Sequence, residues 1–590
     1  MFFVLLIDYL TVVPYNIDMN NEKYFLHPVY EWQRRYEALR ASFVDRLPAR
    51  FVADKFKYSE NYIRLLRHQF MHGKIDFSEP VPEGKSNRRS VPKYVREKII
   101  EYRKNNFSGG QIAECLSEEG YEISVRTVER VLREEGFPKL PRRSRLKMAI
   151  TVQGAHIPDK SRIISLSDID ELIVNSSNAG VFLFAPFISQ LKIDNIVREA
   201  ALPGSKIIAA KNYLLSFLAL KLLGNERFAH VGQYSFDPGL APFIGLNSMP
   251  KCTAMSTYSY SLDQVHLLGL QKAFINAGRN LGLYDGRIFN LDFHTIPHYG
   301  DKSVLERNWA GARGKTMKGA LTLFAQDAET KLMLYTSADI LGTEADEQVL
   351  EFVSFWKNVQ RGVKPTLVFD SKFTDYEHLS ELNQKGVKFI TLRRRGKNLV
   401  ANIKKLSPWK RIHIPRAKRK YPNPLVHESL IELRNYDGTI RQVVVRGNGH
   451  EKPAFAITND FEMPLELIVG NYARRGRVEN GIAEAVKFFN LNALSSPILI
   501  KVHFDVLMTM MADTLYSMLA RKLRGFEDCD ASKIYRHFVR GKGKVTVQNG
   551  LVTVVFPRRA HNPILRAVPW ENFPSRLPAF NRGKLSLVFQ

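Results

Sequence analysis

The sequence predicts a multidomain α+β protein in which N-terminal helical modules and a helical connecting domain precede a mixed α/β core that a β-rich insertion interrupts. Three observations favour this fold class. The 590-residue chain is long enough for three or four domains. A helical pattern occurs twice before residue 147, and short apolar runs typical of strands dominate residues 286–463. The predicted boundaries are 1–77, 92–147, 176–285, 286–400, 401–463, 464–525 and 526–590.

The composition indicates a polyanionic partner. Lys and Arg number 86 against 59 Asp and Glu, which gives a net charge of +27, and this charge recurs along the chain instead of forming one tail. Nucleic acid is the commonest partner of such a protein. The three cysteines are scattered, so neither a disulfide framework nor a cysteine zinc site is expected. We expect a cytoplasmic, nucleoid-associated prokaryotic protein that uses no membrane.

The first helical module is expected between Asp45 and His72. "DRLPARFVADKF" has apolar residues near helical spacing, and Ser59 is placed to cap a second helix, "ENYIRLLRHQF". The second helix would present polar side chains away from an apolar stripe, as a recognition helix in a major groove requires. These outward residues are Asn61, Arg64 and Arg67. The pattern predicts a helix-turn-helix module, with a plain helical hairpin as the alternative.

A second module is predicted beyond a polar linker at residues 78–92. Ser124 is placed to cap a helix that buries Val128 and Val131 and directs Arg126 and Arg130 outward. The basic segment 141–147 is interpreted as a linker that contacts phosphates. Two such modules in series would lengthen the binding site and increase the overall affinity for DNA.

The predicted core contains two aspartates in apolar strands. Asp292 lies within the strand "RIFNLDF", and Asp370 ends the apolar run "PTLVF". An aspartate in such a strand costs free energy unless it is paired or binds a cation. Further strands are expected at 319–326, 331–338 and 387–396, and helices at 344–359 and 375–384. Since the two strands with aspartates are expected to be neighbours, the pattern predicts a cation site.

A third acid belongs to "NYARRGRVEN", residues 471–480. If 468–489 is one helix, Tyr472, Arg475 and Glu479 lie within an arc of about 60°, beside an apolar stripe that includes Val478 and Ile482. The remaining arginines of this stretch, Arg474 and Arg477, fall on the far side. The helix would therefore direct one carboxylate along the sheet.

Asp292, Asp370 and Glu479 together resemble the acidic triad of DDE transposases with a ribonuclease H-like core. "YARRGRVEN" is similar to the Tyr-Arg-Glu signature of cut-and-paste bacterial insertion-sequence transposases. In that family a lysine follows the glutamate by seven positions. Here Val486 occupies that position and Lys487 comes one later. Alternating runs between residues 401 and 463 resemble the β-rich insertion that these transposases carry.

The resemblance implies a DNA transposase in which the three acids are catalytic and bind two Mg²⁺ ions, with Mn²⁺ as a substitute. It implies hydrolysis at the ends of the element followed by transesterification into target DNA. Double-stranded DNA would be the partner and a synaptic homodimer the assembly. The implied DNA contacts of the core are Tyr472, Arg475, Arg474, Arg477 and Lys487. A domesticated DNA-binding regulator with an inactive core and a metal-dependent nuclease without strand transfer remain alternatives.

Other features receive structural interpretations. His294 and His298 flank Pro297, which breaks the helix that a metal pair at this spacing needs. Asp327 is interpreted as a turn residue and Trp409 as a core residue, with base stacking as the alternative for Trp409. An amphipathic helix that packs on the core or mediates dimerisation is expected over 497–523. A hairpin that turns at Asn549 and Gly550 is also expected.

Overall fold

The computed structural model describes most of the chain. The described residues are 31–75, 77, 91–104, 107–135, 137, 161–166, 169, 171–234, 237–299, 305–360, 362–373, 375–394, 396–414, 421–449, 452–493, 498–580 and 583–590. Residues 1–30, most of the predicted linker 78–92 and the basic segment 141–147 lie outside them. The chain divides into two compact units, Met1–Pro141 and Arg142–Gln590.

The first unit contains two sets of helices, and the first set comprises α2 (Glu31–Phe43), α3 (Ala49–Phe56) and α4 (Glu60–Met71). Ser59 caps α4 as predicted, because its hydroxyl accepts a hydrogen bond of 3.2 Å from the Tyr62 amide. Lys57 adopts a left-handed conformation, with φ of 56°, and so ends α3. The predicted helix pair is confirmed, and α2 adds a third helix that packs against it.

The second set of helices comprises α5 (Lys93–Lys104), α6 (Gly109–Glu118) and α7 (Val125–Glu134). Ser108 and Gln111 form a reciprocal capping box at the start of α6, and Ser124 caps α7 as predicted. Val128 and Val131 are buried, which leaves Arg126 exposed on the other side of α7. The sequence pattern therefore specifies these helices correctly.

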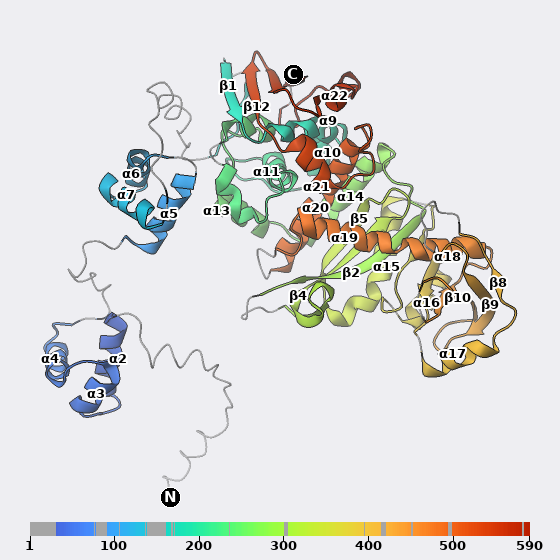
Figure 1. Cartoon of the computed structure of the whole chain (residues 1–590), viewed down its shortest axis with the longest axis horizontal. Coiled ribbons are helices and arrows are strands. Elements are labelled where there is room, and N and C mark those ends of the chain that lie inside the picture. The colour runs from blue at the N-terminus through green and yellow to red at the C-terminus, as the bar shows by residue number, and fades with distance from the viewer. Residues whose placement is uncertain are drawn as a thin grey trace, which may run out of the picture. The chain divides into compact units, whose positions relative to one another are not determined.

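The second unit is a mixed α/β structure built on one large sheet (Figure 1). Its strand order is β3-β4-β2-β6-β7-β11-β10-β9-β8, and β5 also pairs with β4. The strands are β2 (Ile288–Pro297), β3 (Arg307–Ala310), β4 (Lys315–Asp327), β5 (Met333–Ile340), β6 (Thr366–Val368), β7 (Lys388–Leu392), β8 (Lys410–Arg411), β9 (Leu425–Glu432), β10 (Thr439–Arg446) and β11 (Ala454–Thr458). The strands β2, β6 and β7 are parallel, and the other pairings are antiparallel.

The strands of the predicted insertion extend the core sheet. The strand β11 pairs with β7 in the register Ala456↔Leu392, so β8–β11 continue the sheet beyond the parallel strands. In Figure 1 these strands and α17 (Lys397–Ala401) lie at the opposite end of the unit from β1 and β12. Trp409 is half-buried and its indole donates a hydrogen bond of 2.8 Å to the Leu406 carbonyl. This placement agrees with the packing role expected for Trp409.

Helices flank the sheet and form its apolar layers. The Trp356 ring on α15 (Gln348–Val359) is fully buried, with its centroid 4.6 Å from that of Phe289 on β2. The helix α16 (Tyr376–Gln384) connects β6 to β7, as a parallel pair of strands requires. Two further helices, α18 (Leu465–Arg474) and α19 (Gly476–Phe488), lie on the face of β2 that bears Asn290 and Asp292. Asp292, which lies on β2, is therefore beside these two helices.

The helix α20 (Leu499–Ala520) is buried on nearly all sides, so the expectation of an amphipathic helix is wrong. It packs against β5, α11 (Ala210–Leu222) and α14 (Gln264–Asn280). Lys221 on α11 is paired with Asp505 on α20 at 2.9 Å, which offsets the cost of burying the lysine. The remaining helices of this region are α9 (Ala185–Gln190), α10 (Ile193–Glu199), α12 (Ala241–Ile244) and α13 (Cys252–Tyr260).

A second sheet contains the C-terminal hairpin. Its strand order is β1 (Glu171–Ser176), β12 (Gly543–Gln548), β13 (Leu551–Phe556) and β14 (Lys584–Phe589). Asn549 and Gly550 have φ of 51° and 74°, as expected for the predicted two-residue turn. Two short helices, α21 (Ala531–Ile534) and α22 (Asn562–Arg566), complete this part. Within the described ranges no single helix is long and apolar enough to cross a membrane.

Candidate active site

Asp292 and Asp370 follow equivalent positions of two adjacent parallel strands. Asn290 on β2 pairs with Val368, the last residue of β6; two residues further along the chain, Asp292 lies within β2 and Asp370 lies just beyond the end of β6. Adjacent strands run about 4.8 Å apart, so the two carboxylates leave the sheet side by side. The side chain of Asp292 is 23% exposed, and Asp370 Oδ1 accepts a hydrogen bond of 2.7 Å from the Ser371 amide. The predicted adjacency of the two strands is confirmed.

The stretch "NYARRGRVEN" spans the junction of α18 and α19 instead of lying within one helix over 468–489. Arg475 separates the two helices but keeps helical dihedral angles, with φ of −53° and ψ of −38°. The hydrogen bonds Arg475 N→Tyr472 O and Val478 N→Arg475 O, each 3.0 Å long, tighten the junction. Gly476 lowers the helix propensity at this point, which accounts for the break between α18 and α19. Tyr472, Arg475 and Glu479 nevertheless remain on one side.

Arg475 joins the acids of the strand and of the helix. Its Nη1 lies 3.4 Å from Asp292 Oδ1, and its Nη2 donates a hydrogen bond of 2.5 Å to Glu479 Oε1. The Arg475 side chain is only 14% exposed, whereas Glu479 is 52% exposed. A half-buried guanidinium therefore holds Asp292 and Glu479 from the two elements in one cluster.

The charges of the cluster shift one another's pKa values. Burial raises the pKa of Asp292 to about 6; the carboxylates of Glu479 and Asp370 raise it as well, while the Arg475 charge lowers it. Burial works against the charged form of Arg475, but the neighbouring acids outweigh it and raise the pKa of the guanidinium. Burial also raises the pKa of Tyr472 to about 12. Tyr472 thus keeps its hydroxyl proton and Arg475 its charge at neutral pH.

The turn between β4 and β5 contacts the junction of α18 and α19 through two arginines. Arg474 forms an ion pair with Glu329, and the Arg477 guanidinium donates a hydrogen bond to the Ala328 carbonyl. Asp327 is fully buried in this turn and accepts hydrogen bonds from four backbone amides, so its predicted turn role is confirmed. Both arginines predicted to contact DNA are therefore engaged with this turn, and their DNA roles remain a prediction.

Two polar residues beside the cluster are absent from the sequence-based site. Asn290 on β2 donates a hydrogen bond of 3.4 Å to the Arg474 carbonyl, and Gln326 on β4 donates one of 3.3 Å to the Arg477 carbonyl. Both side chains are buried within otherwise apolar strands. Asn290 precedes Asp292 by two positions, and strand alternation places it on the same face. The sequence signal that could have identified Asn290 is therefore its position two residues before Asp292 in the same strand.

His294 also lies on the face of Asp292, but it has a protein partner. Its Nε2 is 2.7 Å from Asn492 Oδ1, and burial lowers the pKa of the His294 imidazole. The Phe293 ring, on the other face, stacks on Phe373 with ring centroids 4.2 Å apart. The contact with Asn492 and the burial of the ring give His294 a structural role, as expected.

The donor chemistry of the three acids, though not their spacing in this structure, fits a hard divalent cation. Three carboxylates supply the oxygen ligands that Mg²⁺ prefers. Within the described part of the chain, no three His, Cys, Asp or Glu side chains converge closely enough to hold a metal ion. Arg475 Nη1 is buried without a hydrogen-bond partner between the acids and supplies positive charge there.

Residues 284–515 match the family model of the transposase DDE domain. The match supports a DDE transposase family, includes all three acids of the cluster and covers less than half of the 590-residue chain. No curated protein matches the chain.

Lys487 lies outside the acidic cluster. It is exposed in the last turn of α19 near Glu484, whose pKa burial raises and the Lys487 charge lowers. Val486, which holds the position of the family lysine, packs against the core. Lys487 therefore remains a candidate DNA contact at some distance along α19.

The candidate DNA-binding residues of the first unit lie on α4 and α7. Arg64 is paired with Glu60 at 2.6 Å, and the Arg67 guanidinium lies 5.4 Å from the centroid of the Phe43 ring. Asn61 and Arg126 are exposed, and Arg130 lies 3.8 Å from Glu134. Their roles in DNA binding stay predictions.

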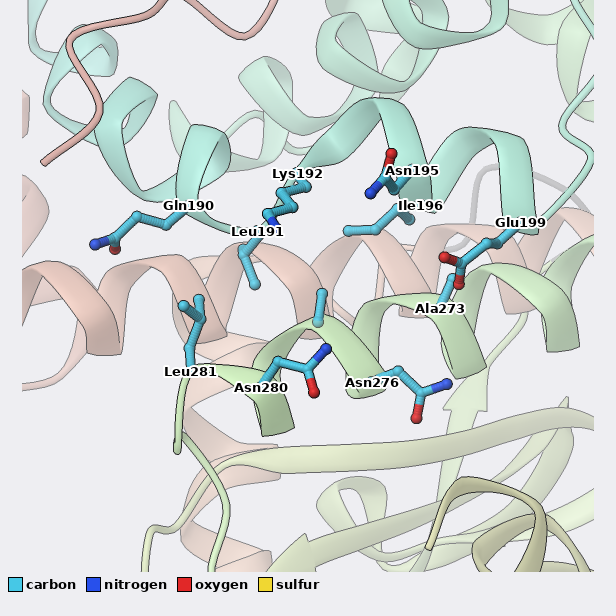
Figure 2. Close-up of a pocket in the computed structure, with 11 residues that line it drawn as sticks. Gln190, Leu191, Lys192, Asn195, Ile196, Glu199, Ala273, Asn276, Asn280 and Leu281 are labelled. Carbon is cyan, nitrogen blue, oxygen red and sulfur yellow. The ribbon is translucent and has the colours of Figure 1, made fainter.

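A pocket of about 230 Å³ lies between α10 and α14, away from the acidic cluster (Figure 2). Carboxamide side chains and two charged groups line it, as Figure 2 shows for Asn195, Asn276 and Asn280. It contains none of the residues predicted for the site. The acidic cluster lies beside β2 and the end of β6, and not in this pocket.

Proposed function

We propose that the protein is a transposase that binds the ends of an insertion sequence and catalyses metal-dependent strand cleavage and transfer into target DNA. The observation that carries the proposal is the cluster in which Arg475 contacts both Asp292 and Glu479 beside Asp370. The match of residues 284–515 to the transposase DDE domain supports it. So does the net charge of +27, which suits a protein that follows a polyanion over a long surface.

In this proposal Asp292, Asp370 and Glu479 hold Mg²⁺, or Mn²⁺ in its place. When bound, the metal lowers the pKa of the attacking water or 3′-hydroxyl and stabilises the leaving oxygen. The strands β2 and β6 fix the positions of the two aspartates, because Asp292 lies within β2 and Asp370 follows the last residue of the neighbouring strand β6 by two positions. Glu479, on a helix and 52% exposed, is the acid with the greatest freedom to reorient. A ribonuclease H-like core is part of the proposal.

The neighbouring side chains would bind the DNA strand. Arg475 remains charged and offers a planar guanidinium that pairs with phosphate oxygens in a forked geometry. Tyr472, with a pKa raised to about 12, keeps its proton and donates a hydrogen bond to a phosphate oxygen. Both side chains leave the same helix junction as Glu479, so they orient the scissile phosphate over the acids.

The first unit would recognise the terminal repeats as two helix-turn-helix modules. The helices α4 and α7 carry Asn61, Arg64, Arg67, Arg126 and Arg130 for this purpose. Two ends must be held together for cutting, so we propose a homodimer as the active assembly. Lys487, Arg474 and Arg477 would contact the backbone of the bound end.

The product formed from DNA that carries the flanks of the protein's own gene tests this proposal. Wild type is compared with Asp292→Asn, Glu479→Gln and the matched control Glu466→Gln, which lies outside the cluster. We expect wild type and the control to cut and join the ends with Mg²⁺, and both cluster variants to bind without reaction. Binding without cutting by wild type would identify a regulator, and cutting without joining a nuclease. Either result would overturn the proposal.

A further inference from the structure

The C-terminal part of the second unit contains a long segment without acids. Residues 531–566 include eight Lys or Arg residues and no Asp or Glu. The structure describes this whole segment, and seven of the eight basic side chains are exposed. They are Lys533, Arg536, Arg540, Lys542, Lys544, Arg558 and Arg566. Within the described chain none of the seven forms an ion pair with an acid, so the segment carries unbalanced positive charge.

Two stretches of this segment pack together at a pair of histidines. The ring centroids of His537 and His561 lie 4.6 Å apart. The half-buried Arg559 guanidinium donates a hydrogen bond of 3.4 Å to the Phe538 carbonyl and a second one to the Arg540 carbonyl. Arg559 thereby holds the stretch around His561 against the stretch around His537.

Basic side chains surround the two histidines. Lys533 Nζ lies 5.2 Å from the centroid of the Phe526 ring, and that centroid lies 5.7 Å from the centroid of the His537 ring. Partial burial lowers the pKa of His537, and the neighbouring His561 lowers it as well. The charges of Arg536 and Lys533 lower this pKa further, which places both cations close to the imidazole. We call Lys533, Arg536, His537, Arg540 and His561 the basic surface.

The basic surface adjoins the helix that carries Glu479. The last residue of α19, Phe488, has its ring centroid 5.2 Å from that of Tyr535, which immediately precedes Arg536. Burial raises the pKa of Tyr535 and the Arg540 charge opposes this rise, so Arg540 also lies near this contact. Figure 1 shows α21 beside α19, in agreement with the contacts between them. One helix therefore connects the acidic cluster to the basic surface.

The exposed stripe of α19 carries no negative charge beyond Glu479. Four side chains of α19 are exposed, those of Glu479, Asn480, Ala483 and Lys487. At about 100° per residue they lie within an arc of about 100°. Glu484, the other acid of this helix, is half-buried and accepts a hydrogen bond of 2.5 Å from the first amide of α21. A DNA backbone that runs from the acids along this stripe therefore reaches Lys487 and then the basic surface.

The acids that precede the basic surface in the chain are bound by other groups. Asp528 is paired with Lys331 at 2.9 Å. Asp530 caps α21 and accepts a hydrogen bond of 2.7 Å from the Lys533 amide. Glu527 accepts a hydrogen bond of 2.9 Å from an amide of its own loop. Since none of the three forms an ion pair with the basic surface in the described chain, they leave its charge available to a partner.

The side chains of the basic surface suit nucleic acid better than another protein. Protein interfaces gather apolar and aromatic side chains at their centre and contain few lysines. Among residues 531–566, which the structure describes in full, the exposed large hydrophobic side chain is Leu551, in the hairpin of β12 and β13. Guanidinium and imidazole groups donate hydrogen bonds to phosphate oxygens, and a DNA backbone supplies repeated negative charge. The charge therefore selects the DNA backbone as the occupant.

We propose that the basic surface binds the phosphate backbone of duplex DNA that lies beside the acidic cluster. Arg536 and Arg540 pair with phosphate oxygens, and the His537 imidazole donates a hydrogen bond to the same backbone. The inference rests on the proposed transposase function, because the acidic cluster is taken as the position of the reacting phosphate. It gives the C-terminal part of the chain a role in holding DNA, separate from the chemistry.

The length of α19 sets the position of this contact on the DNA. From Glu479 to Phe488 the helix axis rises about 14 Å, at about 1.5 Å per residue. B-form DNA rises about 3.4 Å per base pair, so this distance spans about four base pairs. Because the basic surface begins just beyond Phe488, we expect it to contact the duplex about four to six base pairs from the reacting phosphate.

Hydroxyl-radical footprinting with flank DNA tests the basic surface. Glu479→Gln serves as the background, so that the DNA stays intact, and Arg536→Gln/Arg540→Gln is added to it. The control adds Lys272→Gln/Lys357→Gln, which removes the same charge from exposed positions on α14 and α15. We expect only the surface variant to lose protection about four to six base pairs from the cleavage point and about tenfold in affinity. Its slope of log affinity against log salt should fall by about two.

A second duplex of unrelated sequence, added to the complex with flank DNA, distinguishes the two DNAs that the proposed function brings to the acids. Loss of protection on the flank DNA would assign the basic surface to the end of the element. An unchanged flank footprint with weaker capture of the unrelated duplex would assign the surface to target DNA.

Unchanged protection, affinity and salt dependence with both DNAs would overturn the role of the basic surface. A change in the number of protein copies in solution with unchanged DNA binding would also overturn it, because the surface would then bind a second copy. Neither result affects the proposed function while wild type cuts and joins the flank DNA. A footprint that depends on the basic surface in a protein that cuts nothing would support the surface and reject the proposed function.

Discussion

Arg475 Nη1 lies 3.4 Å from Asp292 Oδ1, although the two residues come from a helix junction and a strand that are far apart in the sequence. The same guanidinium binds Glu479. In this arrangement a protein cation supplies the positive charge that the acids need. A divalent metal ion at the acids and Arg475 in its present position compete for the same carboxylate oxygens.

We therefore predict that Arg475→Gln binds Mn²⁺ about tenfold more tightly than wild type. Titration calorimetry at pH 8 provides the measurement. This pH is needed because the Arg475 charge lowers the pKa of Asp292, so the variant has a more basic Asp292 that must still be ionised. Arg474→Gln is the control, since Arg474 pairs with Glu329 outside the cluster. Equal or weaker binding of Mn²⁺ by the Arg475 variant would contradict this competition.

Asp327→Ala should lower the free energy of unfolding by about 3 kcal/mol or more. The Asp327 carboxylate accepts hydrogen bonds from the amides of Asp285, Gly286, Glu329 and Thr330, and alanine would leave these buried donors without an acceptor. Urea denaturation measures the change. Glu329→Ala, which removes a half-exposed acid from the same turn, is expected to cost much less. Equal losses in the two variants would show that the turn, and not the buried carboxylate, determines stability.

Asp513→Asn should stabilise the protein at alkaline pH. Burial raises the pKa of Asp513 to about 8, and the Glu484 carboxylate contributes to the rise. The folded state thus holds a proton that the unfolded chain releases near pH 4, so stability falls as pH rises from about 4 to 8. Replacing the acid removes this loss, and thermal melting at pH 8 should show a gain of several degrees.

At pH 4 the melting temperatures of wild type and Asp513→Asn should converge, because the aspartate is then protonated in both states. The exposed Glu462→Gln serves as the control and should show no such pattern. A stabilisation of equal size at pH 4 and pH 8 would mean that packing, and not the charge, is responsible.

Arg126→Ala should weaken DNA binding in a salt-dependent manner. Arg126 is exposed on α7 behind the buried valines, where a recognition helix presents its contacts. Loss of one phosphate contact reduces the slope of log affinity against log salt by about one. Fluorescence anisotropy with flank DNA at several salt concentrations measures this slope, with the exposed Glu122→Gln as the control. An unchanged slope would remove Arg126 from the interface.

The sequence predicts the elements of this protein well where the signal is local. The caps at Ser59 and Ser124, the alternation around Asp292 and the turn at Asn549 and Gly550 each depend on a few neighbouring residues. The two aspartates could also be singled out from the sequence, because a carboxylate in an apolar strand costs free energy unless it is paired or binds a cation.

The features that the sequence does not reveal depend on contacts between distant segments. The pairing of Arg475 with Asp292 requires the packing of α19 on β2, which no local pattern encodes. The burial of α20 on nearly all sides follows from its contacts with β5, α11 and α14. The pairing of β3 with β4 could not be predicted either, because sequence spacing alone does not show that Arg307 pairs with Lys318, next to the pair Pro297 and Gly319.

The central claim is that Asp292 acts as a metal-binding carboxylate in strand cleavage. Its most direct test is the metal dependence of cleavage of flank DNA by Asp292→Cys, because a thiolate binds Mn²⁺ better than the harder Mg²⁺. We predict that wild type cuts with either metal, and that the variant is inactive with Mg²⁺ and regains activity with Mn²⁺. Full activity of the variant with Mg²⁺, or no recovery with Mn²⁺ while the variant still binds DNA, would contradict the claim.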